Sequence, residues 1–174
     1  MMNAITVDRH DLALLDALQR SGDATNAVLG ERVHLSASQV SRRLQRLQDA
    51  GLIAGYAALL DPAALGLGVT AFAHVTLERH GAQRPDAFES GVAALPEVLE
   101  CFSVSGSADY VLRIVAPDLA AFSELMMKRL LRLPGVANIK TDIALHKIKQ
   151  THVLPLEHIA RPPRPASRLR YAGG

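Results

Sequence analysis

The sequence predicts an α+β chain of two parts, a winged helix-turn-helix three-helix bundle followed by a ferredoxin-like βαββαβ domain. Two short helical patterns joined only by His34 and Leu35 predict the first part. From residue 69 the pattern changes to alternating strands and helices, which predicts the second part. The motif Leu-Pro-x-Val recurs at residues 95–98 and 133–136, each time closing a helix and opening a strand, so the second part reads as two tandem units.

The first two helices are marked by their N-caps. Asp8 is the expected cap of the first helix, with Asp11 at the third helical position, where a carboxylate favours the helix dipole. Thr25 is the expected cap of the second. The apolar stripe of the first helix is expected to be Leu12, Leu15 and Leu18.

The third helix carries the strongest local signal. Ser36 with Gln39 three residues later forms a capping box, and Gly51 is a suitable stop residue. The apolar residues Val40, Leu44 and Leu47 share one face. The opposite face and its flanks hold three arginines and no acid before Asp49, and its candidate DNA-contacting residues are Ser36, Ser38, Gln39, Ser41, Arg42, Arg43 and Arg46.

A helix of this kind, presented after a tight turn, suits the major groove of duplex DNA. Arginine can pair with guanine and glutamine with adenine, while other arginines contact phosphates. Arg42 is the expected base reader and Arg46 the expected phosphate contact. The alternative interpretation is an ordinary amphipathic helix with a solvated basic face.

The domain plan assigns residues 1–60 to the helix-turn-helix domain, 61–68 to a hinge, 69–156 to the ferredoxin-like domain and 157–174 to a disordered basic tail. Strands are expected at residues 53–60, 69–77, 98–105, 110–115 and 136–149. Helices are expected around residues 88–95 and after Asp118. Two helices on one face of a four-stranded sheet leave the other face bare, which predicts an oligomer interface near Phe72 and Phe102.

Composition narrows the class of protein. The chain of 174 residues holds 19 Lys and Arg against 17 Asp and Glu. Four of those arginines lie in the acid-free residues 161–174, so the preceding part holds 15 basic against 17 acidic groups. Only the local patch on the third helix therefore argues for DNA. The tail is expected to be solvated, with phosphate contact as the alternative. A single cysteine, Cys101, and no apolar run of membrane length favour the cytoplasm.

Several fragments carry a family resemblance by their order and spacing. They are Val7-Asp8-x-x-Asp11, Leu35-Ser36, Val40, Arg43-Leu44-x-Arg46-Leu47, Gly51-x-Ile53-x-Gly55-Tyr56, Leu60-Asp61-Pro62 and Leu65-Gly66, then Pro96-x-Val98, Val104-x-Gly106-x-x-Asp109-Tyr110, Leu133-Pro134-Gly135-Val136 and Lys147. Over about residues 7–156 the chain resembles the Lrp/AsnC family of transcriptional regulators. The resemblance implies an N-terminal DNA-binding domain and a C-terminal effector-sensing domain.

The resemblance also implies the partners. These are partly palindromic double-stranded promoter DNA, an amino-acid effector, and further copies of the chain as a homodimer that assembles into higher oligomers such as an octamer. A cytoplasmic, nucleoid-associated protein is expected. The effector of the family lies at the turn matched here, so the implied effector-binding residues are Gly106, Ser107, Ala108, Asp109, Tyr110 and, more weakly, Thr141. Asp109 would hold the ammonium group and backbone N–H groups the carboxylate. A plain hairpin turn is the alternative.

Departures from the family pattern affect both sites. His34 stands where a glycine is usual, and the turn lacks one acid and one aromatic residue. The function predicted is DNA-binding regulation by a small effector, and the alternative is an architectural DNA binder without an effector. An enzyme is the third class. It is not expected, because the seven histidines and Cys101 show no catalytic or metal-binding spacing, and no cofactor or metal is predicted.

Overall fold

The computed structural model describes residues 5–78, 85–160 and 169–171. The chain forms two compact units, Met1–Ala58 with Lys149–Gly174, and Leu59–Ile148. The sequence predicts that the second domain runs to residue 156, whereas residues 149–156 group with the first unit. There the side chain of Gln19 exchanges two hydrogen bonds with the backbone of Leu154. In the described ranges, no helix has the length and hydropathy needed to cross a bilayer.

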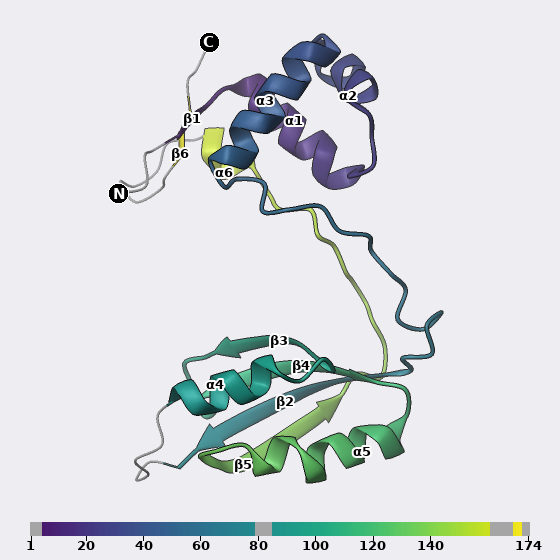
Figure 1. The fold of residues 1–174 in the computed structure, drawn as a ribbon, viewed down its shortest axis with the longest axis vertical. Coiled ribbons are helices and arrows are strands. Elements are labelled where there is room, and N and C mark those ends of the chain that lie inside the picture. The colour runs from purple at the N-terminus through teal and green to yellow at the C-terminus, as the bar shows by residue number, and fades with distance from the viewer. Residues whose placement is uncertain (1–4, 79–84, 161–168, 172–174) are drawn as a thin grey trace. The chain divides into compact units, whose positions relative to one another are not determined.

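Three helices build the first unit: α1 (Arg9–Arg20), α2 (Asn26–Val33) and α3 (Ala37–Asp49) (Figure 1). Their three predicted N-caps are confirmed. Asp8 and Ser36 each form a complete capping box, and the Thr25 hydroxyl accepts a hydrogen bond from the backbone of Val28. Each cap satisfies an N–H group that the helix itself leaves without a partner, so each helix begins where the local sequence specifies.

The core of the first unit is apolar with one exception. It contains Leu14, Leu18, Leu29, Val33, Val40 and Leu44. The expected stripe of Leu12, Leu15 and Leu18 is wrong in its phase, because α1 buries Asp11, Leu14 and Leu18 instead. These three share one face at helical spacing. Asp11 is therefore an acid at a core position, and it is fully buried.

The connection between α2 and α3 is held by an unusual backbone conformation. His34 has φ 57° and ψ 46°, the left-handed region, and its N–H group bonds to the carbonyl of Gly30. The carbonyl of Gly30 also accepts the N–H of Leu35 at 2.9 Å. A side chain at Gly30 would meet the backbone oxygen of Leu35 at 2.4 Å, so only glycine permits so tight a turn. This geometry fixes how α3 leaves α2.

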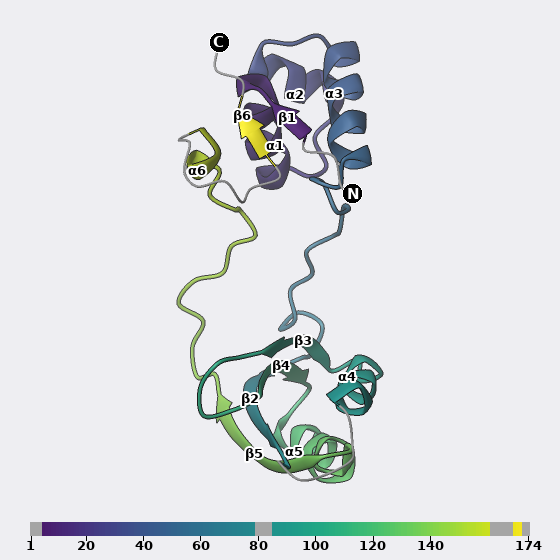
Figure 2. The same cartoon turned by 90° about the vertical axis from the view of Figure 1, so that its left-hand side faces the viewer.

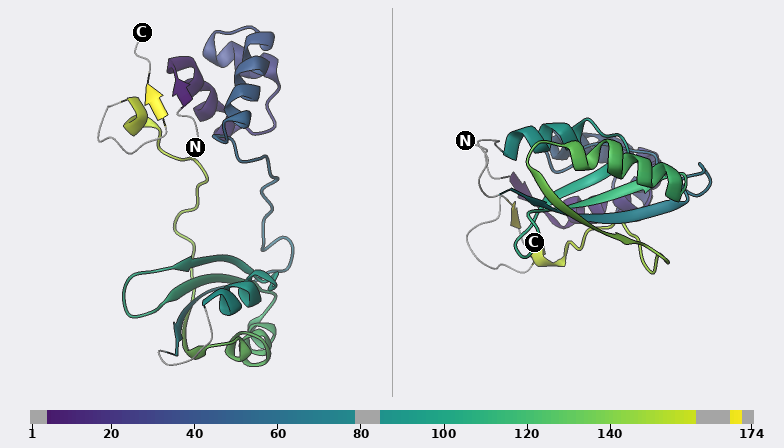
Figure 3. Two further views of the ribbon diagram at one scale, coloured as in Figure 1. Left: turned by 60° about the vertical axis from the view of Figure 1, so that its left-hand side comes forward. Right: turned by 90° about the horizontal axis from the view of Figure 1, so that it is seen from below.

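The second unit is the expected ferredoxin-like fold. Its elements in order are β2 (Val69–Leu77), α4 (Pro85–Ala93), β3 (Val98–Ser103), β4 (Tyr110–Ala116), α5 (Leu119–Lys128), a 3₁₀ turn η1 (Leu130–Arg132) and β5 (Val136–Ile143). The strands form one antiparallel sheet in the order β3-β4-β2-β5. Both α4 and α5 cover the same face of this sheet (Figure 2 and Figure 3).

The two faces of the sheet differ in burial. On the helix-covered face, β2 and β4 bury alternate residues against Phe88, Phe122 and Leu125, as period-two patterning predicts. The opposite face carries Phe72, which is 38% exposed, and Phe102, which is 58% exposed. In the described chain, no helix covers that face (Figure 3).

Two predicted strands differ from the structure. Residues 53–60 form no strand, because no described strand pairs with them, and Leu59 and Leu60 remain largely exposed. The last strand of the sheet ends at Ile143 rather than at residue 149. Its partner β2 begins at Val69, and the N–H of Ala144, which donates to the carbonyl of Thr70, makes the last described backbone bond between the two segments.

The C-terminal segment is not wholly irregular, which corrects the expected disorder of residues 157–174. It contains a short helix, α6 (Glu157–Ala160), and a strand, β6 (Leu169–Tyr171). β6 pairs in parallel with β1 (Ile5–Val7), so segments from the two ends of the sequence lie side by side in the first unit (Figure 1 and Figure 2). The remainder of that expectation, residues 161–168 and 172–174, lies outside the described residues.

Replacing His34 with glycine is expected to stabilise the first unit. A residue with a Cβ in the left-handed region costs about 1 kcal/mol, which glycine avoids. The free energy of unfolding of His34→Gly, measured by urea denaturation, should rise by about that amount. His34→Ala is the matched control, since it removes the imidazole but keeps the Cβ. An equal gain in both variants would show that the imidazole, rather than the backbone, carries the strain.

Candidate nucleic-acid interface and effector turn

The exposed face of α3 is the candidate nucleic-acid interface. Val40, Leu44 and Leu47 are buried against the bundle, whereas Ser38, Ser41, Arg42 and Gln45 are exposed. A shallow hollow runs over this face, lined by Ser38, Ser41, Arg42, Gln45, Arg46 and Asp49. Ser36 and Gln39 are also exposed, but their side chains serve the capping box. The Ser38 hydroxyl lies 3.1 Å from that of Ser36.

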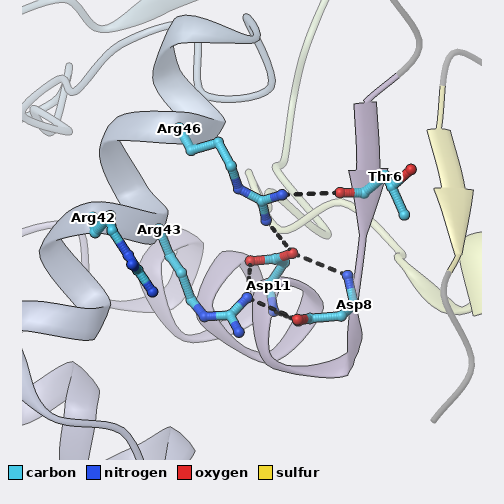
Figure 4. Close-up of a pocket in the computed structure, with 6 residues that line it drawn as sticks. All are labelled: Thr6, Asp8, Asp11, Arg42, Arg43 and Arg46. Carbon is cyan, nitrogen blue, oxygen red and sulfur yellow. Dashed lines mark hydrogen bonds and ion pairs between the residues drawn. The ribbon is translucent and has the colours of Figure 1, made fainter.

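Two of the three arginines of α3 bind acids of the same chain. Arg43 donates to Asp8 Oδ2 at 2.8 Å and to Asp11 Oδ1 at 2.7 Å (Figure 4). Arg46 donates to Asp11 Oδ2, and its other terminal nitrogen donates to the carbonyl oxygen of Thr6 at 3.1 Å. Arg46 is exposed on the outward face and Arg43 is partly exposed on its flank, as expected, but both pair with acids that lie outside α3. The acids come from α1 and its cap, which the pattern within α3 does not reveal.

Asp11 is the centre of this acid–arginine network, which we define as Asp8, Asp11, Arg43 and Arg46. One of its oxygens accepts from Arg43, and the other accepts from Arg46 and from the backbone N–H of Asp8. Its side chain is only 1% exposed. Removing one partner of a buried ion pair costs on the order of 3–5 kcal/mol, whereas an exposed pair contributes about 0.2–1 kcal/mol. Pairing in the network is therefore a strong constraint on both arginines.

The network shifts the pKa of Asp8 and the pKa of Arg43. Partial burial alone would raise the pKa of Asp8, but the backbone N–H of Asp11 and the Arg43 guanidinium outweigh it and lower that pKa. Burial would likewise lower the pKa of Arg43, but the carboxylates of Asp11 and Asp8 raise it. Both shifts favour the charged form, since the carboxylate and the guanidinium stabilise each other.

Arg42 differs from its two neighbours. In Figure 4 its side chain lies beside that of Arg43, and no dashed line joins it to the acids that Arg43 and Arg46 bind. It makes no hydrogen bond or ion pair with the described part of the chain. It lines the hollow described above and also a second one, which it shares with Thr6 and the acid–arginine network. Gln45 is exposed as well, but its amide donates to Asp49 at 2.8 Å. Arg42 is thus the guanidinium of α3 that is available to a partner.

The candidate effector turn joins β3 to β4. Gly106 has φ 141°, and Gly106 and Ser107 are exposed, whereas Ala108 is buried. Asp109 is held on both sides: its N–H donates to Val75 at 2.9 Å, and its Oδ2 accepts the N–H of Leu77 at 2.8 Å. The turn is thus a formed structure with one carboxylate oxygen of Asp109 already bonded to the neighbouring strand.

Tyr110 and Thr141, two residues of the expected effector site, do not line the turn within one chain. The Tyr110 ring packs on Phe88 with centroids 4.8 Å apart, and its hydroxyl donates to Glu89 at 2.8 Å. Burial and the Glu89 carboxylate raise the pKa of Tyr110 to about 12. Thr141 pairs with Ala73, which lies four residues along β2 from Leu77, the residue whose N–H bonds to the Asp109 carboxylate. At about 3.3 Å per residue this separates Thr141 from the turn by roughly 13 Å within one chain.

Other ligand chemistry is sparse. Among the described residues, no three His, Cys, Asp or Glu side chains gather as a metal site would require. Cys101 lies in β3, within the predicted strand 98–105, and it is exposed. Partial desolvation of the thiol and the nearby Glu89 carboxylate raise the pKa of Cys101, which disfavours the nucleophilic thiolate.

Comparison with known proteins identifies both units. A family model described as winged helix-turn-helix DNA-binding matches residues 7–54, and one described as Lrp/AsnC ligand binding domain matches residues 70–154. The leucine-responsive regulatory protein of Klebsiella pneumoniae is 38% identical over 151 residues, which cover 87% of this chain and 92% of that protein.

Solved structures agree with these matches. A transcriptional regulator of Neisseria meningitidis, crystallised as a complex with L-Met, is 41% identical with a TM-score of 0.84, covering 87% of this chain and 98% of its own. An AsnC family transcriptional regulator from Agrobacterium tumefaciens is 33% identical with a TM-score of 0.83, covering 88% and 99%.

Acid should weaken the first unit partly through Asp8. Because the pKa of Asp8 is lower in the folded state than its ordinary value of 3.8, its contribution to stability is present above that value. The contribution is lost as the pH falls below about 4. In urea denaturation between pH 6 and pH 3, Asp8→Asn should therefore show a flatter loss of stability than the unaltered protein. Asp23→Asn, an exposed change outside the network, should keep the original profile; a profile of Asp8→Asn no flatter than this control would contradict the assignment.

Proposed function

Because this chain belongs to the Lrp/AsnC family of transcriptional regulators, we propose that α3 enters the major groove of promoter DNA and reads it through Arg42. One observation carries the proposal: α3 is fixed by a complete capping box and a tight turn, and it exposes Ser38, Ser41 and Arg42 on one face. A rigid helix with outward donors is what groove recognition needs. Gln45 adds an amide suited to adenine once it leaves Asp49.

The proposed DNA site is partly palindromic, because the proposed assembly is a homodimer. The bare sheet face, with exposed Phe72 and Phe102, supports pairing of two copies through the second unit. Two identical α3 helices would then meet successive major grooves about 34 Å apart. Further association, up to an octamer, belongs to the same proposal. Such a protein would work at the nucleoid of the cytoplasm, and it has no proposed catalytic role.

The proposed effector is a free amino acid bound at the turn. Asp109 Oδ1, which bonds to no residue in the described ranges, suits an ammonium group, and the exposed backbone at Gly106 and Ser107 suits a carboxylate. The L-Met complex of the Neisseria meningitidis relative supports an amino acid as the ligand class. Tyr110 contributes to the turn through its packing, and Thr141 would have to contribute from another copy of the chain.

An architectural DNA binder without an effector is the second candidate. The observation that favours it is the hydrogen bond between Asp109 Oδ2 and the N–H of Leu77, which completes the turn without any ligand. The two candidates differ in one measurable property, since only the first gives a protein that responds to an amino acid.

Arg42→Ala is expected to weaken specific DNA binding by about 1–3 kcal/mol, the usual value of a bidentate base contact. The measurement is a footprint titration on a duplex selected by the protein from a random library. Arg132→Ala, an exposed arginine in the second unit, is the matched control and should leave the affinity unchanged. Equal affinities of Arg42→Ala and the unaltered protein would remove Arg42 from base readout.

Asp109→Asn is expected to abolish the response to the effector while the fold persists, because the amide loses the charge that pairs with ammonium. The measurement is a thermal-shift screen of all twenty amino acids against the unaltered protein, followed by the hit against the variant. Asp118→Asn, which changes a helix cap in the same unit, controls for general destabilisation. A screen without any shift would support the architectural candidate.

A further inference from the structure

We propose that Asp8 and Asp11 withhold Arg43 and Arg46 from the DNA backbone, so that α3 meets DNA with Arg42 as its single available guanidinium. The acids of α1 would thereby act as specificity determinants, by limiting affinity for unrelated sequences. The inference rests on the proposed function, in which α3 is the DNA-contacting helix.

The guanidinium groups of Arg43 and Arg46 already donate to partners in the same chain. Arg43 is shared between the two carboxylates, and Arg46 bridges Asp11 to the Thr6 carbonyl of β1. Their side chains are 24% and 46% exposed, so both lie near the surface that DNA would approach. DNA could therefore reach both arginines, but each is already bound. Within the described chain, their partners are Asp8, Asp11 and Thr6.

Releasing either arginine from Asp11 to a DNA phosphate would cost free energy. A phosphate that captured Arg46 would leave Asp11 Oδ2 with only the N–H of Asp8, and one that captured Arg43 would leave Oδ1 without a donor. Because the Asp11 side chain is 1% exposed, water cannot replace the lost donor. The free energy gained from a solvent-exposed contact with phosphate is smaller than the free energy lost when the buried carboxylate gives up its donor. Both arginines therefore stay in the network.

Pairing in the network also affects DNA binding. Two carboxylates cancel the charge of two arginines, which leaves Arg42 as the unpaired cation of the α3 face in the described chain, with Asp49 at the end of the helix. Each phosphate contact adds about 0.9 to the salt slope of DNA affinity and raises affinity for every sequence alike. Withholding two contacts lowers that sequence-independent term, and the base contacts of α3 then decide where the protein binds.

The test is a salt titration of the full chain on the selected duplex and on a scrambled duplex of equal composition, from 50 to 200 mM NaCl. Arg46→Gln should leave the slope on the scrambled duplex unchanged. Asp11→Asn removes the carboxylate that both arginines share and leaves Arg43 with Asp8 alone, so it should steepen that slope by about 0.9 or more and lower the ratio of specific to unspecific affinity. A slope that falls by about 0.9 in Arg46→Gln would overturn the proposal, as would an unchanged slope in folded Asp11→Asn.

Two further variants keep the outcome decisive. If circular dichroism shows that Asp11→Asn is unfolded, Arg43→Gln replaces it: because Asp8 and Asp11 already hold Arg43, its slope on the scrambled duplex should stay unchanged, and a slope that falls by about 0.9 would count against the proposal. Arg42→Ala separates the two levels of inference. If it has no effect on either duplex, α3 is not the DNA-contacting helix and the proposed function fails, whereas an effect of Arg42→Ala with a reduced slope in Arg46→Gln overturns only the withholding.

Discussion

A buried carboxylate must be neutralised, and the first unit of this protein is arranged around that requirement. Asp11 lies in the apolar stripe of α1 and takes its donors from Arg43, Arg46 and the Asp8 backbone. Since the arginines belong to α3 and the N–H to the α1 cap, the charge joins the start of one helix to the middle of another. The orientation of α3 is thus set by electrostatics as well as by apolar packing.

Three constraints of different kinds then converge on α3. The capping box fixes its first residue, the left-handed His34 and the close approach at Gly30 fix its direction from α2, and the network fixes its rotation about its own axis. A helix held in this way can present a small set of side chains with little freedom, which is what reading a groove demands. The chain accepts a strained histidine and a buried charge in the same unit that must contact DNA.

The sequence predicts what is encoded locally and misses what is encoded at a distance. The caps at Asp8, Thr25 and Ser36 depend on residues within one turn, so they are readable from the sequence. The partners of Arg43 and Arg46 lie 32 and 35 residues away, and only the folded bundle brings them together. One sequence signal was available, because Asp11, Leu14 and Leu18 share a face at helical spacing. The apolar residues 53–60 are predicted to form a strand but form none. A strand needs a partner strand to pair with, and apolar composition alone does not supply one.

The pairing of β6 with β1 gives the order of synthesis a role in folding. The first unit draws on residues near both ends of the chain, while the second unit lies wholly between them. On the ribosome, the ligand-binding half would be complete before the last strand of the other half emerges. The three helices can pack early, but the pairing of β1 waits until residues 169–171 have emerged, so a product terminated before them would lack this pair of strands.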